Sequence, residues 1–445
     1  MQQITLNGRF CYQFCLAILS GVIFPPTVIA EKVWVPGWKA ASTLTVPRAG
    51  SALVAHKNKI YVIGGVDGRT FLSSVEMATS NPDGTLSEWK IISSMPVSRG
   101  FTSATVFNSR LYVLGGGNGA YGKNLLKSIA SAPISNNGML GEWRIEAEQM
   151  LLPRRCSKLF VHNDSIFTVG GFGGTLLDSV EAAKFSQSGE LGEWTLHENT
   201  LMRPRYVNSV TKADDYVFVI GGHHESKGIG IKSVEFTSLS KEPLIWKNTH
   251  SLKQGRYAFS STANKKQIYA LGGISGSEYL DSVERLDISQ GIESANWQST
   301  TKLPKKMANF NSIVVNNNLY VIGGSTRQTY LTSVWHSSFD ANGDIGFWGS
   351  QYQRAEAFES TKSSDDESVL RNSGKIIDRI ETDSYSYLLV DTGSKLLWLA
   401  APINNISINS RIRFSEGVFM SNFYSKSLKR NFDAILFVGT VRAEQ

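Results

Sequence analysis

The sequence predicts an all-β protein: a six-bladed β-propeller over residues 31–350, followed by a small β-barrel over residues 373–445. Three observations lead to this prediction. A strand-like hexapeptide ending in Gly-Gly recurs six times, a tryptophan follows each copy, and a different strand pattern begins after residue 372. With 41% hydrophobic residues, 11% aromatic residues and 40 glycines, the composition also favours strands and turns over helices.

The first 30 residues read as a secretory signal peptide rather than as part of the fold. Met1–Arg9 is polar with one positive charge, and Phe10–Phe24 is an apolar run that ends at Pro25 and Pro26. Small or short residues then lead to Ala30, after which we expect cleavage. The run is shorter than the roughly 20 apolar residues of a membrane span. We therefore expect an exported product, periplasmic or secreted, with no transmembrane segment after cleavage.

A repeat of about 50 residues organises residues 31–350. Its first mark is an apolar strand that ends in two glycines, with successive first glycines spaced by 51, 55, 51, 51 and 51 residues. These first glycines are Gly64, Gly115, Gly170, Gly221, Gly272 and Gly323. A tryptophan follows the second glycine 23 to 27 residues later, and the six are Trp89, Trp143, Trp194, Trp246, Trp297 and Trp348. Such a recurrence indicates one structural unit per period.

Each period reads as four strands separated by turn residues. In the first period Gly50–His56 and Ile60–Gly65 are apolar, as expected near a propeller axis. Ser73–Thr79 then alternates, and Glu88–Ser93 surrounds the tryptophan. Glycines near a crowded axis let neighbouring blades approach and adopt dihedral angles closed to other residues. The tryptophan supplies apolar area for packing one blade against the next.

The period, the Gly-Gly strand ends and the tryptophans resemble the Kelch family, in which each repeat forms one blade. The resemblance implies six blades and covers most of the chain between residues 31 and 350. One feature departs from the family: its usual tyrosine-and-tryptophan spacing is replaced by LSEW at 86–89 and LGEW at 140–143 and 191–194. This departure leaves the fold intact but weakens any transfer of residue roles from a particular member.

An additional tryptophan bears on how the ring of blades closes. Trp38 stands at the same distance before its repeat as Trp89 does before the next. Propellers avoid exposed sheet edges by combining strands from both ends of the chain in one blade. We expect Val33–Thr43 to complete the blade that begins at Ala308, so that Trp348 leads out of the propeller. The alternative is the reverse assignment, with Trp348 in the blade.

Arginine recurs sixteen residues before the first glycine, at Arg48, Arg99, Arg154, Arg205 and Arg256, with Met307 in the sixth repeat. The third strands carry Glu76, Glu181, Glu235 and Glu284, replaced by Ala130 and Trp335 in the second and sixth repeats. One interpretation is that the two residue types pair as repeat scaffold. The other is a basic basin at one mouth of the channel for a carboxylate, which arginine binds bidentately. The Kelch resemblance implies that arginines here can contact acidic ligands, and we predict these five as ligand-binding residues.

The loops after the glycine pairs are expected to open on the same mouth and to vary as a binding surface would. His223, His224 and Glu225 form the most chemically distinctive of these loops and are added to the predicted ligand-binding residues. A turn could converge them on a metal, yet no third histidine is placed to join them. We predict no metal, no cofactor and no catalytic residue. Because the sixth repeat lacks both the arginine and the glutamate, we expect any asymmetric function there.

Residues 351–372 contain SSDDES and read as a linker. The strand candidates after it are Gly374–Thr382, Ser386–Thr392, Leu396–Ala401, Ser410–Phe414 and Ala434–Val441. Five strands in about 70 residues suit a small OB-type barrel. The segment also resembles small exported bacterial modules that are judged to be OB-like.

Charge and cysteine content restrict the function classes. The formal charge of +7 comes without a basic run interleaved with aromatics, so nucleic-acid binding is not predicted. Cleavage after Ala30 leaves Cys156 as the one cysteine, which excludes an internal disulfide and favours a structural thiol. The first hypothesis is an exported, non-enzymatic binding or scaffolding protein that contacts a protein or carbohydrate at the channel mouth. The alternative is a periplasmic carbohydrate-active enzyme resembling sialic-acid mutarotase, which needs only an acid/base residue and a cationic clamp.

Overall fold

The computed structural model describes residues 33–224, 228–349, 370, 372–382, 385–401, 405–415, 417–425, 428–438 and 440–444. The predicted signal peptide, nearly all of the predicted linker and Glu225 lie outside these ranges. The domain boundaries drawn there therefore stay predictions. Within the described ranges, none of the helices has the length and hydropathy that crossing a bilayer requires.

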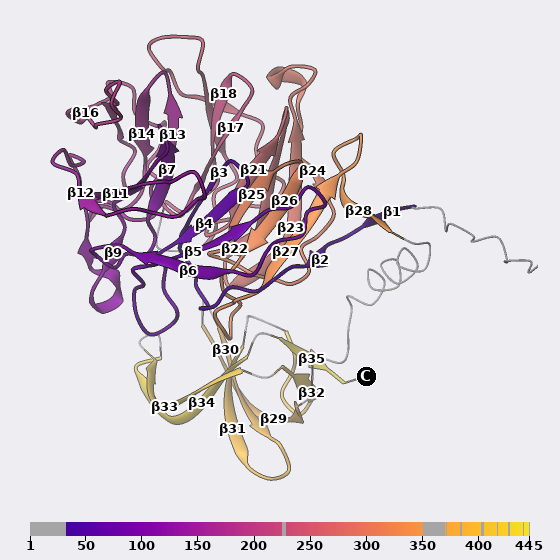
Figure 1. The fold of residues 1–445 in the computed structure, drawn as a ribbon. Helices are drawn as coiled ribbons and strands as arrows, with labels where there is room; N and C mark the ends of the chain where they lie inside the picture. Colours follow the sequence, from indigo (N-terminus) through magenta and orange to yellow (C-terminus); the bar gives the residue numbers. More distant parts are fainter. Residues whose placement is uncertain are drawn as a thin grey trace, which may run out of the picture.

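Described residues 33–349 form six antiparallel sheets arranged as the blades of a β-propeller (Figure 1). The innermost strands contact one another in a closed circle, β3–β7–β13–β17–β21–β25 and back to β3. The prediction of an all-β propeller with six blades is confirmed. Blade 1 contains β3 (Ala52–His56), β4 (Lys59–Ile63), β5 (Ser74–Thr79) and β6 (Lys90–Ser94). Blade 2 contains β7 (Ser103–Phe107), β8 (Arg110–Leu114), β11 (Ile129–Pro133) and β12 (Arg144–Ile145).

The other blades repeat this order. Blade 3 contains β13 (Lys158–His162), β14 (Ser165–Val169), β15 (Val180–Lys184) and β16 (Thr195–Leu196). Blade 4 contains β17 (Ser209–Ala213), β18 (Tyr216–Ile220), β19 (Val234–Ser238) and β20 (Lys247–Thr249). Blade 5 contains β21 (Ser260–Asn264), β22 (Gln267–Ser275), β23 (Glu278–Asp287) and β24 (Gln298–Thr300). Short elements between blade strands are β9 (Gly117–Asn118), η1 (Ala120–Gly122), β10 (Asn124–Leu125) and η2 (Ile292–Ser294).

The hydrophobic core of the propeller lies between the blades. A separate cluster of buried apolar side chains fills each interface between neighbouring blades, including the one that joins blade 6 to blade 1. Trp89, Trp194, Trp246 and Trp297 are each at most 5% exposed within these clusters. These four tryptophans therefore pack one sheet against the next, as their positions predicted.

The glycine pairs join neighbouring blades through backbone hydrogen bonds. The second glycine of each pair donates its N–H to the carbonyl at the arginine position of the following blade, with Gly324 reaching Arg48 at 2.8 Å. The first glycine approaches that same carbonyl: a Cβ at Gly323 would lie 2.7 Å from the Arg48 oxygen, and Gly323 has a φ of +64°. Only glycine fits both conditions at this position.

Blade 6 is completed from both ends of the described propeller. It contains β25 (Asn311–Val315), β26 (Asn318–Ile322), β27 (Val334–Phe339) and β28 (Ile345–Gly349), with β1 (Val33–Pro36) and β2 (Lys39–Ala40). β2 pairs with the first half of β27, whereas β28 pairs with the end of β27 and then with β1 (Figure 1).

The tryptophans show which strand takes the usual outer position in blade 6. Trp38 donates its indole N–H to Lys302 in blade 5, as Trp89 and Trp297 do to the blades before them, while Trp348 is 58% exposed. The predicted closure by Val33–Thr43 is confirmed. The prediction that Trp348 leads out of the propeller is wrong, because β28 pairs with β27 and β1 in the same sheet.

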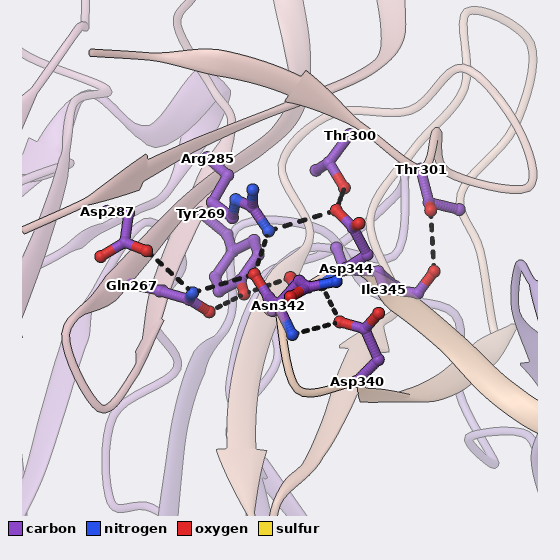
Figure 2. A network of polar contacts seen from close by, with 11 residues as sticks. Gln267, Tyr269, Arg285, Asp287, Thr300, Thr301, Asp340, Asn342, Asp344 and Ile345 are labelled. Carbon is purple, nitrogen blue, oxygen red and sulfur yellow. Dashed lines mark hydrogen bonds and ion pairs between the residues drawn. The ribbon is translucent and has the colours of Figure 1, made fainter. Parts of the chain in front are cut away.

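A polar network joins blade 5 to the turn between β27 and β28 (Figure 2). Tyr269 donates its hydroxyl hydrogen to Gly343 O at 2.6 Å, and Arg285 contacts Asp344 at 3.2 Å. Thr301 donates to Ile345 O at 2.7 Å. Tyrosines in other blades make the equivalent bond to a turn glycine of the next blade, for example Tyr61 to Gly138. Burial raises the pKa of the Tyr269 hydroxyl, so this side chain stays a neutral hydrogen-bond donor.

We expect Tyr269→Phe to lower the free energy of unfolding by about 1 kcal/mol, because a buried carbonyl loses its donor while the ring packing is kept. Phenylalanine already occupies this position in blades 3 and 4, at Phe167 and Phe218, so the fold tolerates it. Urea denaturation of both forms measures the change. Tyr121→Phe, at a side chain 88% exposed, serves as the control and should be neutral. Equal effects of the two substitutions would contradict the role given to the Tyr269 hydroxyl.

The described residues beyond 370 form one seven-stranded sheet in the order β33–β34–β31–β30–β29–β32–β35. Its strands are β29 (Asn372–Glu381), β30 (Ser386–Asp391), β31 (Leu396–Ala401), β32 (Arg411–Phe414), β33 (Gly417–Ser425), β34 (Arg430–Val438) and β35 (Val441–Ala443). β31 and β34 pair in parallel, and β35, two residues after β34, pairs with β32. Starting from β29, the pairings lead through β30 and β31 to β34. The chain then continues from β34 into β35, which pairs with β32, and β32 pairs with β29 again.

Four of the predicted C-terminal strands are confirmed within two residues, and the fifth begins earlier, at Arg430. β33 was not predicted, because Ser and Asn interrupt the apolar alternation of Gly417–Ser425. Leu388, Leu399 and Phe414 are buried in a core on one side of this sheet.

Candidate functional site

The loops after the glycine pairs and the starts of the innermost strands share one mouth of the propeller. Antiparallel pairing places Ala52 opposite Ile63, so the first strand of blade 1 begins where the second one ends. Beyond this pair, Ala49 bridges to Val66 in the loop after the glycines. The other blades repeat the arrangement, as in the bridge between Tyr206 and His223. The predicted location of these loops is confirmed.

The five predicted arginines do not reach this mouth. Arg48, Arg99, Arg154, Arg205 and Arg256 are all 0% exposed. Their guanidinium groups point into the blades, where Nη1 donates to the carbonyl of the first glycine. In four blades Nη2 contacts the glutamate of the third strand, so the pairs are Arg48–Glu76, Arg154–Glu181, Arg205–Glu235 and Arg256–Glu284. The prediction of a basic basin is therefore wrong for these side chains, and the scaffold interpretation holds.

Blade 5 shows how such a charge is compensated inside the protein. Arg256 donates to Gly272 O at 2.8 Å and to Ser282 O at 2.9 Å, and its Nη2 lies 2.7 Å from a Glu284 oxygen. The two Glu284 oxygens also accept backbone N–H groups of Lys253 at 2.7 Å and Gln254 at 3.1 Å. Burial lowers the pKa of Arg256, and the adjacent Glu284 carboxylate opposes this shift. The pair fixes the entry of the chain into its innermost strand.

Two blades lack the ion pair for different reasons. In blade 2, Ala130 replaces the glutamate, and Arg99 bonds to Gly115 O at 3.0 Å and Ser128 O at 2.9 Å. Desolvation lowers the pKa of Arg99 to about 10. In blade 6, Met307 is 0% exposed within an apolar cluster that Trp335 also contacts. An apolar pair thus replaces the ionic one, which is a stable exchange in a core. The expectation of an asymmetric function in the sixth repeat finds no support at these two residues.

The asymmetry of the mouth lies in the residues directly after the arginines and after the glycine pairs. In blades 6, 1 and 2 these residues are small: the facing pairs are Ala308–Ser325, Ala49–Val66 and Gly100–Gly117. In blades 3 and 4 they are large, and Tyr257 continues the row in blade 5. We name Arg155, Phe172, Tyr206, His223 and Tyr257 the aromatic arc.

The members of the aromatic arc contact one another in sequence around half of the mouth. The Arg155 guanidinium lies 5.3 Å from the Phe172 ring centre, and that ring lies 6.2 Å from Tyr206. His223 stands edge-on between the two tyrosines, 5.5 Å from Tyr206 and 5.0 Å from Tyr257. Arg155 is held in place by hydrogen bonds from its Nη1 to Tyr121 O at 3.2 Å and Gly122 O at 3.0 Å. Distances of this order are typical of attractive ring and cation–π contacts.

Burial raises the pKa of Tyr206 and of Tyr257, so both present neutral phenol groups at physiological pH. His223 is 7% exposed and His224 is partly buried, while Glu225 lies outside the described residues. Of the predicted loop residues, the structure thus brings His223 into the arc. Within the described ranges, no three histidine, cysteine, aspartate or glutamate side chains gather as a metal site would require.

A ring of residues surrounds the axis below the mouth, and backbone hydrogen bonds join five of its six neighbouring pairs. The residues at this ring are Gly50, Phe101, Cys156, Val207, Ala258 and Asn309, and all six have φ between 46° and 59°. Phe101 N donates to Gly50 O at 2.6 Å, and Cys156 N donates to Phe101 O at 2.8 Å. Ala258, Asn309 and Gly50 continue the sequence around the axis. A cavity of about 40 Å³ lies at this ring, which we call the axial cavity.

Cys156 belongs to this ring and is 9% exposed. Burial raises the pKa of its thiol to about 11, against the opposing effect of Arg155. Because a raised pKa leaves almost no thiolate at pH 8, we expect native protein from residue 31 onward to react with a thiol reagent far more slowly than unfolded protein. Ellman titration with and without denaturant measures the ratio. A native rate equal to the unfolded rate would contradict the burial of this side chain.

A larger groove of about 670 Å³ lies at the opposite face, between blades 5 and 6. It borders the network of Figure 2, and several of its polar groups are bonded to one another. Gln267 donates to Asp287 at 3.1 Å and to Asn342 O at 3.1 Å, and Asn264 donates to Asn317 at 3.2 Å. These groups hold the blades together, so the mouth is the better candidate site.

Three arginines of the C-terminal sheet are also engaged in contacts within that sheet. Arg411 and Arg413 each lie 3.2 Å from a Glu444 oxygen. The Arg430 guanidinium lies over the rings of Trp398, at 4.9 Å, and Phe432, at 5.0 Å.

Comparison with known proteins supports the repeat assignment. The Kelch motif model matches residues 47–77, 255–292 and 306–336. The fold, the repeat and these matches together define a six-bladed β-propeller that carries Kelch motifs. A solved structure entitled "Structure of YjhT" has the same fold, with a TM-score of 0.57 and 14% identity over 69% of this chain and 99% of that one.

Among curated proteins, Kelch-like protein 40 of Xenopus laevis is 28% identical over 119 residues, which is 27% of this chain and 18% of the relative. Beta-scruin of Limulus polyphemus is 24% identical over 294 residues, 62% of this chain and 30% of the relative. The chain spans less than a third of the length of these relatives.

Proposed function

We propose that this protein binds a protein or glycan partner through the aromatic arc at the propeller mouth and has no catalytic activity of its own. The observation that carries the proposal is the asymmetry of the mouth. Large aromatic side chains and a positioned arginine line blades 3 to 5, whereas alanine, glycine, valine and serine line blades 6, 1 and 2. Nothing in the propeller scaffold requires this difference, because all six blades keep the backbone bridge between the residue after the arginine position and the residue after the glycine pair.

The chemistry of the arc suits contact with a partner. Tyrosine and phenylalanine provide large rigid surfaces at low entropic cost, and arginine adds a directional charge. Tyr206 and Tyr257 remain partly exposed, and Arg155 is fixed by two backbone carbonyls. A sugar ring or an apolar side chain can pack on the rings while a carboxylate reaches the guanidinium.

The enzyme alternative needs an acid/base residue in a ligand-sized pocket. The axial cavity holds about 40 Å³, and no carboxylate stands among the described residues that line it. Asp67 accepts hydrogen bonds from its own loop, and Glu278 pairs with Lys306 at 2.9 Å. These observations favour the binding hypothesis over a mutarotase.

Export and an OB-like barrel at the C-terminus complete the proposal. Residues 1–30 contain a positively charged start, then an apolar run, then small residues, and this order supports export. The circuit of strand pairings from β29 back through β32 supports a closed barrel, with β33 as an added strand.

Arrays of glycans and of peptides probed with the full chain test the proposal. For the ligand that binds best, we expect Tyr206→Ala and Tyr257→Ala each to weaken binding at least about tenfold. Tyr330→Ala is the matched control, because Tyr330 is 38% exposed in the corresponding loop of blade 6. If all three substitutions act alike, the arc is not the binding surface. A sialic-acid anomerisation rate above that of buffer, lost on Arg155→Ala, would replace the binding hypothesis with the enzyme.

A further inference from the structure

The axial cavity contains a positive charge that no other blade provides. Lys158 stands two residues after the ring, where blades 2, 4 and 5 have Ser103, Ser209 and Ser260. Those serines bond across to a neighbouring blade, as Ser209 does with Ser261 at 2.7 Å. Lys158 instead lines the cavity and is partly exposed, and among the described residues its ammonium group has neither a hydrogen bond nor an ion pair.

The neighbouring blade contributes a buried amide that has no hydrogen-bond partner among the described residues. Asn208 is 1% exposed and lines the same cavity. Neither its amide oxygen nor its amide nitrogen has a hydrogen-bond partner within the described ranges. A buried amide left unpaired costs of the order of 1–3 kcal/mol, so native structures normally satisfy it with protein, water or an ion.

From this geometry we propose that the axial cavity binds one small monovalent anion, such as chloride, between the Lys158 ammonium and the Asn208 amide nitrogen. The volume of about 40 Å³ suits a particle slightly larger than one water molecule. The charge has the required sign, because Lys158 is the only ionisable side chain besides the Cys156 thiol among the described lining residues. Burial lowers the pKa of Lys158, which an anion beside the ammonium would oppose.

The first test is thermal unfolding of the full chain while chloride replaces gluconate at constant ionic strength. A bound anion stabilises the folded state by mass action, so Tm should rise by about 2 °C when chloride exceeds its dissociation constant tenfold. Lys158→Met should abolish the rise. Lys184→Met, at an exposed lysine on β15 of the same blade, should keep it. Equal responses in the two variants, or no response in the unmodified protein, would overturn the proposal.

A second test does not depend on variants that fold. Crystals soaked in bromide should give an anomalous peak within the axial cavity, within contact distance of Lys158 and Asn208. Water alone at that position would overturn the proposal. If Lys158→Met does not fold, Asn208→Ala replaces it in the thermal experiment and should weaken the chloride response at least tenfold in apparent affinity.

Discussion

Glu284→Ala is expected to lower the free energy of unfolding by about 3–5 kcal/mol, the usual cost of leaving a buried charge without its partner. Arg256 would remain fully buried and would lose the carboxylate 2.7 Å from its Nη2. Two backbone N–H groups, of Lys253 and Gln254, would lose their acceptor in the same step. Chemical denaturation with and without the substitution measures the loss.

The same strand offers a matched control. Glu278 on β23 pairs with Lys306 at 2.9 Å, but the two side chains are 60% and 56% exposed. Such a surface pair contributes about 0–1 kcal/mol, so Glu278→Ala should change little. Should Glu284→Ala prove as mild as Glu278→Ala, the repeated Arg–Glu pair would not be the scaffold that the geometry indicates.

Gly323→Ala is the second substitution with a large expected effect. The new methyl group would lie 2.7 Å from the Arg48 carbonyl, at the interface where blade 6 meets blade 1. The left-handed backbone conformation costs about 1–2 kcal/mol for alanine, and the contact adds roughly 1–3 kcal/mol more. We expect a total loss of several kcal/mol of stability by thermal and chemical unfolding.

Gly174→Ala separates the two contributions. Gly174 also has a positive φ, of +102°, yet nothing lies within 4 Å of a Cβ built there. This control therefore carries the backbone penalty without the contact. A loss at Gly174 as large as that at Gly323 would show that conformation alone, and not the approach of neighbouring blades, explains the glycine pairs.

The repeat could be predicted from the sequence because its marks are local and occur six times. Each glycine pair, tryptophan and turn reports on its own blade, so a departure in one repeat does not obscure the others. The role of Trp38 in closing blade 6 followed from the same spacing, and its hydrogen bond to Lys302 confirms it.

The functional surface was harder to predict for a physical reason. Spacing places an arginine at the start of an innermost strand, but it does not say whether the guanidinium points to solvent or into the blade. Here Arg205 points inward to Glu235, while the next residue, Tyr206, faces the mouth. The residues that directly follow the arginines already differ in size between repeats, and these large residues are what marks the aromatic arc in the sequence. This difference could be interpreted only once the structure showed on which side of the strand these residues lie.

The lining of the axial cavity was out of reach of the sequence. Lys158 stands where three other blades have serine, and Asn208 where three have serine or threonine, which alone reads as ordinary variation. Their significance comes from the absence of any polar partner for Asn208 among the described residues, and a sequence cannot show that.

The pairing of β1 with β28 also determines how the propeller would respond to a pulling force. Val33, the first residue of β1, lies opposite Gly349, the last residue of β28. Tension applied to the chain before residue 33 and after residue 349 would therefore peel the two strands apart one hydrogen bond at a time, rather than shear them together. Force would therefore open blade 6 first. The opening would stop where β2 pairs with β27 and where Trp38 bonds to Lys302 of blade 5. The strand pairing that closes the ring of blades is thus a mechanical weak point.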